Sequence, residues 1–142
     1  MSLDIKYTTE ALSTGAGRNG HVRTADGTVD FQLAMPKELG GSGNGANPEQ
    51  LFAAGYAACF HSALQAVARA QKVDIGDSSV GARVSLGTTD DGGFGLAVAL
   101  EVIIPTLEQA EAQKLADAAH AVCPYSDAVR GNIDVAVTVA AD

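Results

Sequence analysis

The chain has 142 residues and a mass of 14.4 kDa, a length typical of one domain, so we expect a single domain over residues 1–142. Hydrophobic residues make up 46% and charged residues 18%, which supports a packed core and argues against disorder. The net charge is −8, so the surface repels phosphate backbones and we expect no nucleic-acid partner. Two cysteines are too few to hold a fold together by disulfides.

Residues 51–70, LFAAGYAACFHSALQAVARA, are long and apolar enough to raise the question of a membrane span. They are rich in Ala rather than Leu or Ile, and His61, Gln65 and Arg69 interrupt them, each of which is costly in hydrocarbon. A helix buried in a soluble protein fits better. The N-terminus, MSLDIKYTTEALSTG, lacks the basic and apolar regions of a secretory signal, so we expect a cytoplasmic protein that is not bound to a membrane.

The first part of the chain shows the alternation of apolar and polar side chains that is typical of strands. Residues 28–35 alternate in this way, and an Asp-Gly turn pairs them with residues 20–25 as a hairpin. Residues 4–12 form a weaker strand candidate. The glycine-rich residues 36–46 then predict a flexible connection.

A long central helix follows. Asn47 can cap it, Pro48 fits its first position and Gln50 stands three residues after the cap, so we expect a helix that runs to about Gln71. This helix is apolar nearly all round, which is typical of a helix covered on every side. A chain of this size has few residues left to pack against every side of the helix, which points to a second subunit that covers part of it.

The second part of the chain predicts a further hairpin, a helix and a last strand. Residues 79–89 and 94–104 flank an Asp-Asp-Gly-Gly turn, and residues 133–140 alternate as a one-sided strand. Strands joined by short turns, with helices between them, predict an α+β fold whose antiparallel sheets carry helices on one face.

The second helix has its own local signals. Thr106 and Gln109 have the spacing of a capping box, so we expect the helix to begin there and to reach about Val122. Pro124 follows and ends it.

The two cysteines have two interpretations. Cys59 falls in the middle of the central helix and Cys123 at the end of the second helix, and free cysteines often pack as small hydrophobic residues. Alternatively they form a redox pair, in which one thiolate is oxidised to sulfenic acid and the other thiol condenses with it. That chemistry needs two thiols close in space and a nearby cation, because burial alone raises the pKa of a thiol.

Few cations are available for that role. Arg18 lies in the loop Gly-Ala-Gly-Arg-Asn-Gly, where glycines allow a close approach of backbone, although a loop arginine is usually solvated. Arg69, Arg83 and Arg130 are rivals. Glu49 lies in the first turn of the central helix, where the helix dipole stabilises a carboxylate, and this explains its position unless Glu49 also orients an arginine.

The histidines offer a competing interpretation. His120 and Cys123 are three residues apart on one helix face, a spacing compatible with metal ligation. A zinc site of Cys59, His120 and Cys123 would make the chain a non-catalytic metal-binding or structural protein. A Cys-His hydrolase dyad is a further alternative, but Cys59 and His61 point apart on a helix.

Three segments resemble a known family, the organic hydroperoxide resistance (Ohr) proteins, one branch of the wider Ohr/OsmC family of thiol peroxidases. They are residues 36–60 (PKELGGSGNGANPEQLFAAGYAACF), 94–102 (FGLAVALEV) and 122–139 (VCPYSDAVRGNIDVAVTV). The likeness extends over essentially the whole chain. Asp127 stands where the family more often has Asn, and His61 occupies a variable position; both bear on the pocket rather than on the redox residues.

The resemblance implies roles for four residues. Cys59 is expected to be the peroxidatic thiol and Cys123 the resolving thiol. Arg18 is expected to hold Cys59 as thiolate and to orient the peroxide, and Glu49 to pair with Arg18. Because Glu49 and Cys59 are about 15 Å apart along an ideal helix, the arginine must reach along the helix, the helix must bend near Gly55, or the groups come from different subunits.

The resemblance also implies the substrate and the partners. We expect organic hydroperoxides, including those of fatty acids, to be reduced in preference to hydrogen peroxide; an OsmC-branch enzyme with a broader preference is the nearer alternative. We expect an intertwined homodimer of α+β subunits, no metal or prosthetic group, and a dihydrolipoyl group on a lipoylated protein as reductant. The candidates for an apolar approach to Cys59 are Phe52, Phe60, Phe94 and Tyr125.

Overall fold

The computed structural model describes residues 2–140, and the chain divides into two compact units, Met1–Leu51 and Phe52–Asp142. Each unit is described by itself. The expected single domain over residues 1–142 stays a prediction.

The N-terminal unit contains a three-stranded antiparallel sheet in the order β1 (Ala11–Thr14), β2 (His21–Thr24) and β3 (Asp30–Gln32). The predicted hairpin is confirmed, because β2 and β3 pair across a turn in which Gly27 has a φ of 77°. The strand expected over residues 4–12 is wrong in its bounds. Regular pairing begins only at Ala11, and residues 4–10 are exposed.

The connection to the long helix contains a short 3-10 helix, η2 (Lys37–Leu39), within its glycine-rich stretch. The helix α1 (Pro48–Ala70) follows. Its predicted capping box is confirmed: the backbone N–H of Gln50 donates to Asn47 Oδ1 at 2.9 Å, and the N–H of Asn47 donates to Gln50 Oε1 at 3.1 Å.

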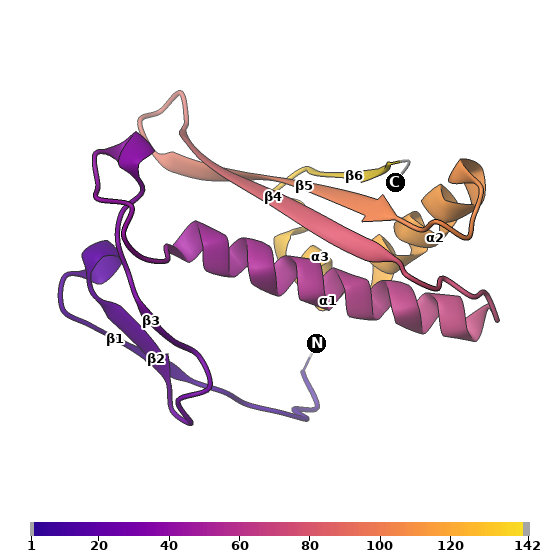
Figure 1. Cartoon of the computed structure of the whole chain (residues 1–142), viewed down its shortest axis with the longest axis horizontal. Helices are drawn as coiled ribbons and strands as arrows, with labels where there is room; N and C mark the ends of the chain where they lie inside the picture. Colours follow the sequence, from indigo (N-terminus) through magenta and orange to yellow (C-terminus); the bar gives the residue numbers. More distant parts are fainter. Residues whose placement is uncertain (1, 141–142) are drawn as a thin grey trace. The chain divides into compact units, whose positions relative to one another are not determined.

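The C-terminal unit contains the second sheet, in the order β4 (Ser79–Thr88), β5 (Phe94–Ile103) and β6 (Val135–Val139). The hairpin of β4 and β5 is antiparallel, as predicted. The expectation of antiparallel pairing is wrong for β6, which pairs with β5 in parallel. The cause is the connection: the chain leaves one end of β5 and crosses back through helices towards the opposite end of the sheet, so β6 runs in the same direction as β5 (Figure 1).

The crossover consists of two helices, α2 (Gln109–Val122) and α3 (Pro124–Val129). The capping box expected at the start of α2 is wrong. Glu108 is the N-cap residue and makes no side-chain cap, while the Thr106 hydroxyl donates to the backbone oxygen of Asp74 at 2.8 Å. Pro124 ends α2 as predicted, but it also opens α3, a position that suits proline because it has no N–H to satisfy.

The hydrophobic core of the C-terminal unit lies between α1, α2 and the second sheet, whose strands β4 and β5 run along α1 (Figure 1). On α1 the buried residues recur every three to four positions and so share one face. The buried core residues are Tyr56, Phe60, Ala63, Leu64 and Ala68 on α1, Val98, Leu100 and Val102 on β5, and Ala112, Leu115, Ala116 and Ala119 on α2.

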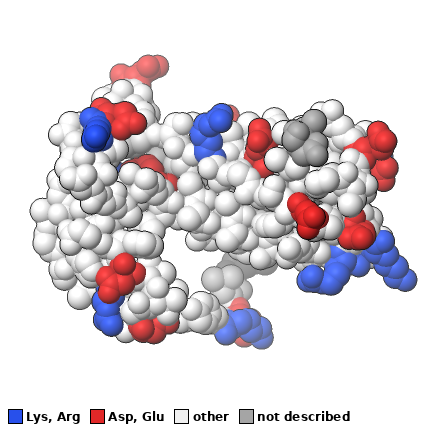
Figure 2. All heavy atoms as spheres, viewed as in Figure 1, with Lys and Arg blue, Asp and Glu red and all other residues white. Residues whose placement is uncertain are grey.

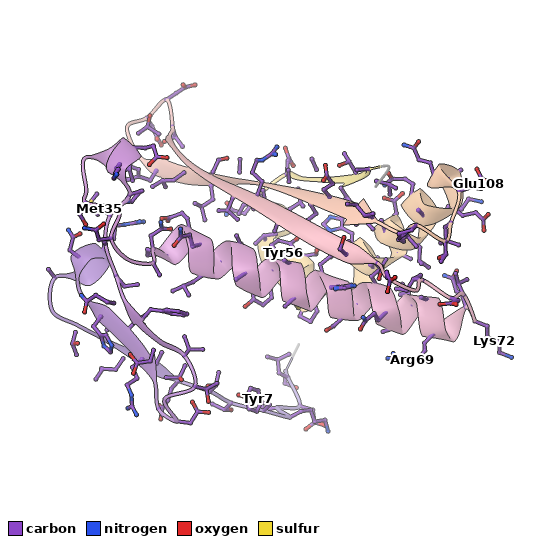
Figure 3. All side chains as sticks on the ribbon, viewed as in Figure 1. Tyr7, Met35, Tyr56, Arg69, Lys72 and Glu108 are labelled. Carbon is purple, nitrogen blue, oxygen red and sulfur yellow. The ribbon has the colours of Figure 1, made fainter. Side chains whose placement is uncertain are left out.

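Helix α1 is fully buried on that face only. Ala54, Ala58 and Ser62, on another face, are exposed, so the cover expected on every side is incomplete within one chain. Among residues 2–140, α1 is the one helix long and apolar enough to cross a membrane. Its packing into the core, together with the exposed Arg69 that extends away from the sheet (Figure 3), favours the predicted helix of a soluble fold.

Candidate functional site

Arg18 lies in a one-turn 3-10 helix, η1 (Gly17–Asn19), between β1 and β2. The glycines around it are required by the backbone. Gly17 has a φ of 62°, in the left-handed region that favours glycine. A Cβ on Gly20 would lie 2.2 Å from the backbone oxygen of Thr14. The glycine-rich sequence therefore forms the tight loop that presents the Arg18 side chain.

Arg18 and Glu49, in the first turn of α1, form a bidentate ion pair within the N-terminal unit. The distances are 2.7 Å from Nη1 to Oε1 and 3.0 Å from Nη2 to Oε2. This hydrogen bonding lowers the pKa of Glu49 and raises the pKa of Arg18, so both stay charged. A guanidinium has five N–H donors, and the pair uses two of them. Three donors remain for another anion.

Cys59 and Cys123 come together within the C-terminal unit. Their sulfurs are 3.8 Å apart, and both residues are free thiols. Cys59 is half-buried on α1, whereas Cys123 is fully buried where α2 ends and α3 begins. The sulfurs must approach by about 1.8 Å to form a disulfide, a distance that side-chain rotation and a small backbone shift can provide.

Burial raises the pKa of the Cys59 thiol, and the neighbouring Cys123 raises it further. The backbone amide of Tyr125 acts in the opposite direction, because it hydrogen-bonds the Cys59 sulfur and stabilises the thiolate. Within the C-terminal unit the balance favours the neutral thiol. A reactive thiolate at this position therefore needs further positive charge or hydrogen-bond donors.

Three aromatic side chains that are near these cysteines in the sequence pack against one another. Phe52 and Tyr56 lie on α1 and Tyr125 on α3 (Tyr56 is labelled in Figure 3), with ring centroids 5.6 to 6.3 Å apart. Gly55 allows this arrangement, because a Cβ there would lie 2.8 Å from the Tyr125 hydroxyl oxygen. Phe52 and Tyr125 were expected near the site, and they are brought together.

The other two expected aromatic residues are placed elsewhere. Phe60 is fully buried in the core, and Phe94 is 77% exposed at the start of β5.

Within the described residues 2–140, no three His, Cys, Asp or Glu side chains are grouped so as to hold a metal ion. His61 is hydrogen-bonded through Nε2 to the Ser78 hydroxyl at 3.0 Å.

His120 takes part in a buried polar chain that the sequence analysis missed. The Ser126 hydroxyl, fully buried, lies 2.7 Å from the Tyr56 hydroxyl and 2.7 Å from His120 Nδ1. Arg130 Nη2 donates to the backbone oxygen of His120 at 2.7 Å. The sequence spacing could have indicated this polar chain, because Tyr56 precedes Cys59 by three residues and Ser126 follows Cys123 by three.

Comparisons with known proteins identify the family of this arrangement. The model of the family described as "OsmC-like protein" matches residues 41–138. The organic hydroperoxide resistance protein of Xanthomonas axonopodis pv. citri (strain 306) is 50% identical over 138 residues, which cover 96% of each chain. The chain belongs to the OsmC-like family, among its organic hydroperoxide resistance proteins.

Solved structures of this family share the fold. An organic hydroperoxide resistance protein from Legionella pneumophila is 55% identical, with a TM-score of 0.92, over 96% of this chain and 99% of the other. One from Elizabethkingia anophelis is 49% identical, also with a TM-score of 0.92, over 99% of this chain and 100% of the other. These comparisons confirm the predicted α+β fold and the family resemblance, and they support a role in resistance to organic peroxides.

For this OsmC-like chain, the site residues expected from sequence fall into two groups. Arg18 is paired with Glu49 in the N-terminal unit, and Cys59 is in contact with Cys123 in the C-terminal unit. What the sequence analysis did not anticipate is the Tyr125 backbone amide on the Cys59 sulfur and the chain of Tyr56, Ser126 and His120.

The environment of His120 predicts a loss of stability in mild acid. Burial and, next, the charge of Arg130 lower the pKa of His120 below its ordinary value of 6.5, while Asp117 opposes them. The unfolded chain therefore binds this proton more readily, so stability is complete above the ordinary value and falls as the pH drops below it.

We expect the melting temperature to fall between about pH 7 and pH 5, and to fall less in His120→Gln, which keeps a polar side chain but cannot titrate. Thermal unfolding followed by circular dichroism at several pH values measures both slopes. Equal slopes in the two proteins would contradict the assignment of this pH dependence to His120.

Proposed function

We propose that the protein is a thiol-dependent peroxidase that reduces organic hydroperoxides, including those of fatty acids, to alcohols. The observation that carries the proposal is the 3.8 Å contact between two free thiols in a member of the organic hydroperoxide resistance proteins. Packing alone explains a buried cysteine, but it does not explain why a half-buried thiol on one helix faces a second thiol at the end of another.

In the first step the Cys59 thiolate attacks the terminal oxygen of the hydroperoxide. The O–O bond breaks, the alkoxide leaves and takes a proton to become the alcohol, and Cys59 is oxidised to sulfenic acid. The half-buried position of Cys59 leaves it within reach of a substrate, whereas the fully buried Cys123 is protected from one. This difference supports Cys59 as the peroxidatic thiol.

In the second step the Cys123 sulfur attacks the sulfenic sulfur of Cys59. An S–S bond forms, the S–O bond breaks, and the departing hydroxide leaves as water with the proton of Cys123. A dithiol then reduces the disulfide through a mixed disulfide and returns both cysteines to thiols. We propose a dihydrolipoyl group on a lipoylated protein as this dithiol, and no resident metal or prosthetic group.

Arg18 is proposed to hold Cys59 as thiolate and to orient the peroxide. The need for such a group follows from the raised pKa of the Cys59 thiol, which burial causes. Three N–H donors of Arg18 remain after its pairing with Glu49. Because Glu49 balances the charge of Arg18, hydrogen bonding rather than net charge is the main contribution, and Glu49 has the role of holding the guanidinium in place.

Phe52 and Tyr125, whose rings are partly exposed and pack against the fully buried Tyr56, are proposed to favour an apolar substrate. Tyr125 supplies a ring that packs against both Phe52 and Tyr56, and its backbone also lowers the pKa of Cys59. A hydroperoxide with a hydrocarbon chain gains from burying that chain against such rings. Hydrogen peroxide has no chain to bury, so it lacks this contribution.

We further propose that the protein works as a homodimer in the cytoplasm. The exposed small residues on α1 and the exposed apolar side chains Leu12 and Phe31 in the first sheet are surfaces that a second copy would cover. Uncharged residues make up most of the face seen in Figure 2. The cytoplasm keeps thiols reduced, as the catalytic cycle requires.

Substitution of each cysteine separates the two steps. Cys59→Ser is expected to reduce the consumption of tert-butyl hydroperoxide to the rate without enzyme, since the attacking thiolate is lost. Cys123→Ser should still react once, after which Cys59 gains extra oxygens because nothing resolves the sulfenic acid. A coupled peroxidase assay and intact-protein mass spectrometry measure these effects. Full activity of Cys59→Ser, or an unchanged mass of Cys123→Ser after peroxide, would contradict the proposed roles.

Arg18→Ala is expected to raise the pKa of Cys59 and to slow its alkylation by iodoacetamide at neutral pH by about tenfold. Arg83→Ala is the matched control, because it removes the same side chain from an exposed position on β4, and it should alkylate like the parent protein. Alkylation rates as a function of pH provide the measurement. If the pH profile of Arg18→Ala is unshifted, Arg18 does not stabilise the thiolate.

A further inference from the structure

Ser126 connects the three helices that carry or flank the two cysteines. Its hydroxyl is fully buried and lies 2.7 Å from the Tyr56 hydroxyl on α1 and 2.7 Å from His120 Nδ1 on α2, while Ser126 itself belongs to α3. Hydrogen bonds between side chains are directional. They therefore restrict how the three helices shift relative to one another.

Each member of this chain is three residues from a reactive cysteine. Tyr56 is one helical turn before Cys59, and His120 is one turn before Cys123. Ser126 follows Cys123 by three residues, after the turn into α3. The Ser126 hydroxyl thus links the helical turn before Cys59 to the segments before and after Cys123.

The hydrogens of this chain can run in two directions while His120 is neutral, depending on which ring nitrogen carries the proton. If Nδ1 is unprotonated, it accepts from Ser126, which accepts from Tyr56, a neutral phenol because burial raises its pKa. If Nδ1 is protonated, it donates to Ser126, which donates to Tyr56. Removal of the Ser126 hydroxyl leaves two partly or fully buried polar atoms unpaired, and the segment must shift to satisfy them.

Formation of the disulfide is sensitive to such a shift. The sulfurs are 3.8 Å apart in the reduced protein, and Cys123 must reach the Cys59 sulfenic acid before a second peroxide does. We propose that Ser126, bridged to Tyr56 and His120, is a positioning residue that holds Cys123 against the Cys59 sulfur for closure of the disulfide. This inference rests on the proposed peroxidase function and deepens it.

The closure step is balanced without any further reagent. The Cys123 sulfur bonds to the Cys59 sulfur, the S–O bond of the sulfenic acid breaks, and the hydroxide leaves as water with the thiol proton of Cys123. Ser126 exchanges no proton or electron in this step. Its role is geometric, so its loss should change the fate of the sulfenic acid and not the formation of it.

The test is a single-turnover experiment on the full-length protein. Reduced protein is mixed with one equivalent of tert-butyl hydroperoxide, quenched at successive times with dimedone and iodoacetamide, and analysed by mass spectrometry. In Ser126→Ala we expect sulfenic acid to form at the rate of the parent protein, disulfide closure to slow by about 10- to 100-fold, and sulfinic acid to appear on Cys59 when peroxide is in excess.

Two further variants keep the result interpretable. Tyr56→Phe retains the ring and removes only its hydroxyl, so it should slow closure in the same direction even if Ser126→Ala folds poorly. Ser78→Ala is the matched control, because it removes a serine hydroxyl bonded to a different histidine, His61. It should close its disulfide like the parent protein.

The outcomes distinguish this inference from the function on which it rests. Parent-like closure without over-oxidation in both Ser126→Ala and Tyr56→Phe would overturn the positioning role and leave the peroxidase function standing. An equal slowing in Ser78→Ala would also overturn it, since the effect would then be general. If the parent protein forms neither sulfenic acid nor disulfide, the proposed function fails and the positioning role fails with it.

Discussion

The 3.8 Å contact between Cys59 and Cys123 depends on how one core is packed. Helix α1 contributes large side chains such as Phe60 and Leu64 to that core, whereas α2 contributes mostly alanines, which allow its backbone to approach closely. Because both helices are held by the same sheet, the two sulfurs meet although many residues separate them in the chain. The redox chemistry proposed for this family member requires that meeting.

The same packing imposes a cost on the chemistry. Burial beside Cys123 raises the pKa of Cys59 and so disfavours the thiolate that must attack a peroxide. The Tyr125 backbone offsets part of this increase in the pKa of Cys59. The remaining N–H donors of Arg18 are proposed to offset more of it. The reactivity proposed for Cys59 therefore depends on these polar neighbours.

Local features of the fold were predictable from the sequence, and long-range ones were not. The cap of α1 depends on Asn47 and its neighbours within one turn, so its residues identify it. Thr106 has the same kind of local signal, yet its hydroxyl bonds the backbone of Asp74, far away in sequence. The parallel pairing of β6 and the burial of Ser126 between three helices likewise depend on tertiary packing, which residue spacing does not report. The resemblance to a known family predicted roles for Cys59 and Cys123. The contacts that hold these two residues in place were found in the structure.

The central claim is that Cys59 and Cys123 are a redox pair for organic hydroperoxides. The most direct measurement is the intact mass of the reduced protein after one equivalent of tert-butyl hydroperoxide, followed by peptide mapping without reduction. We predict the loss of two hydrogens and a peptide that links Cys59 to Cys123. Two unreacted thiols after this treatment would contradict the claim, and the cysteines would then be packing residues.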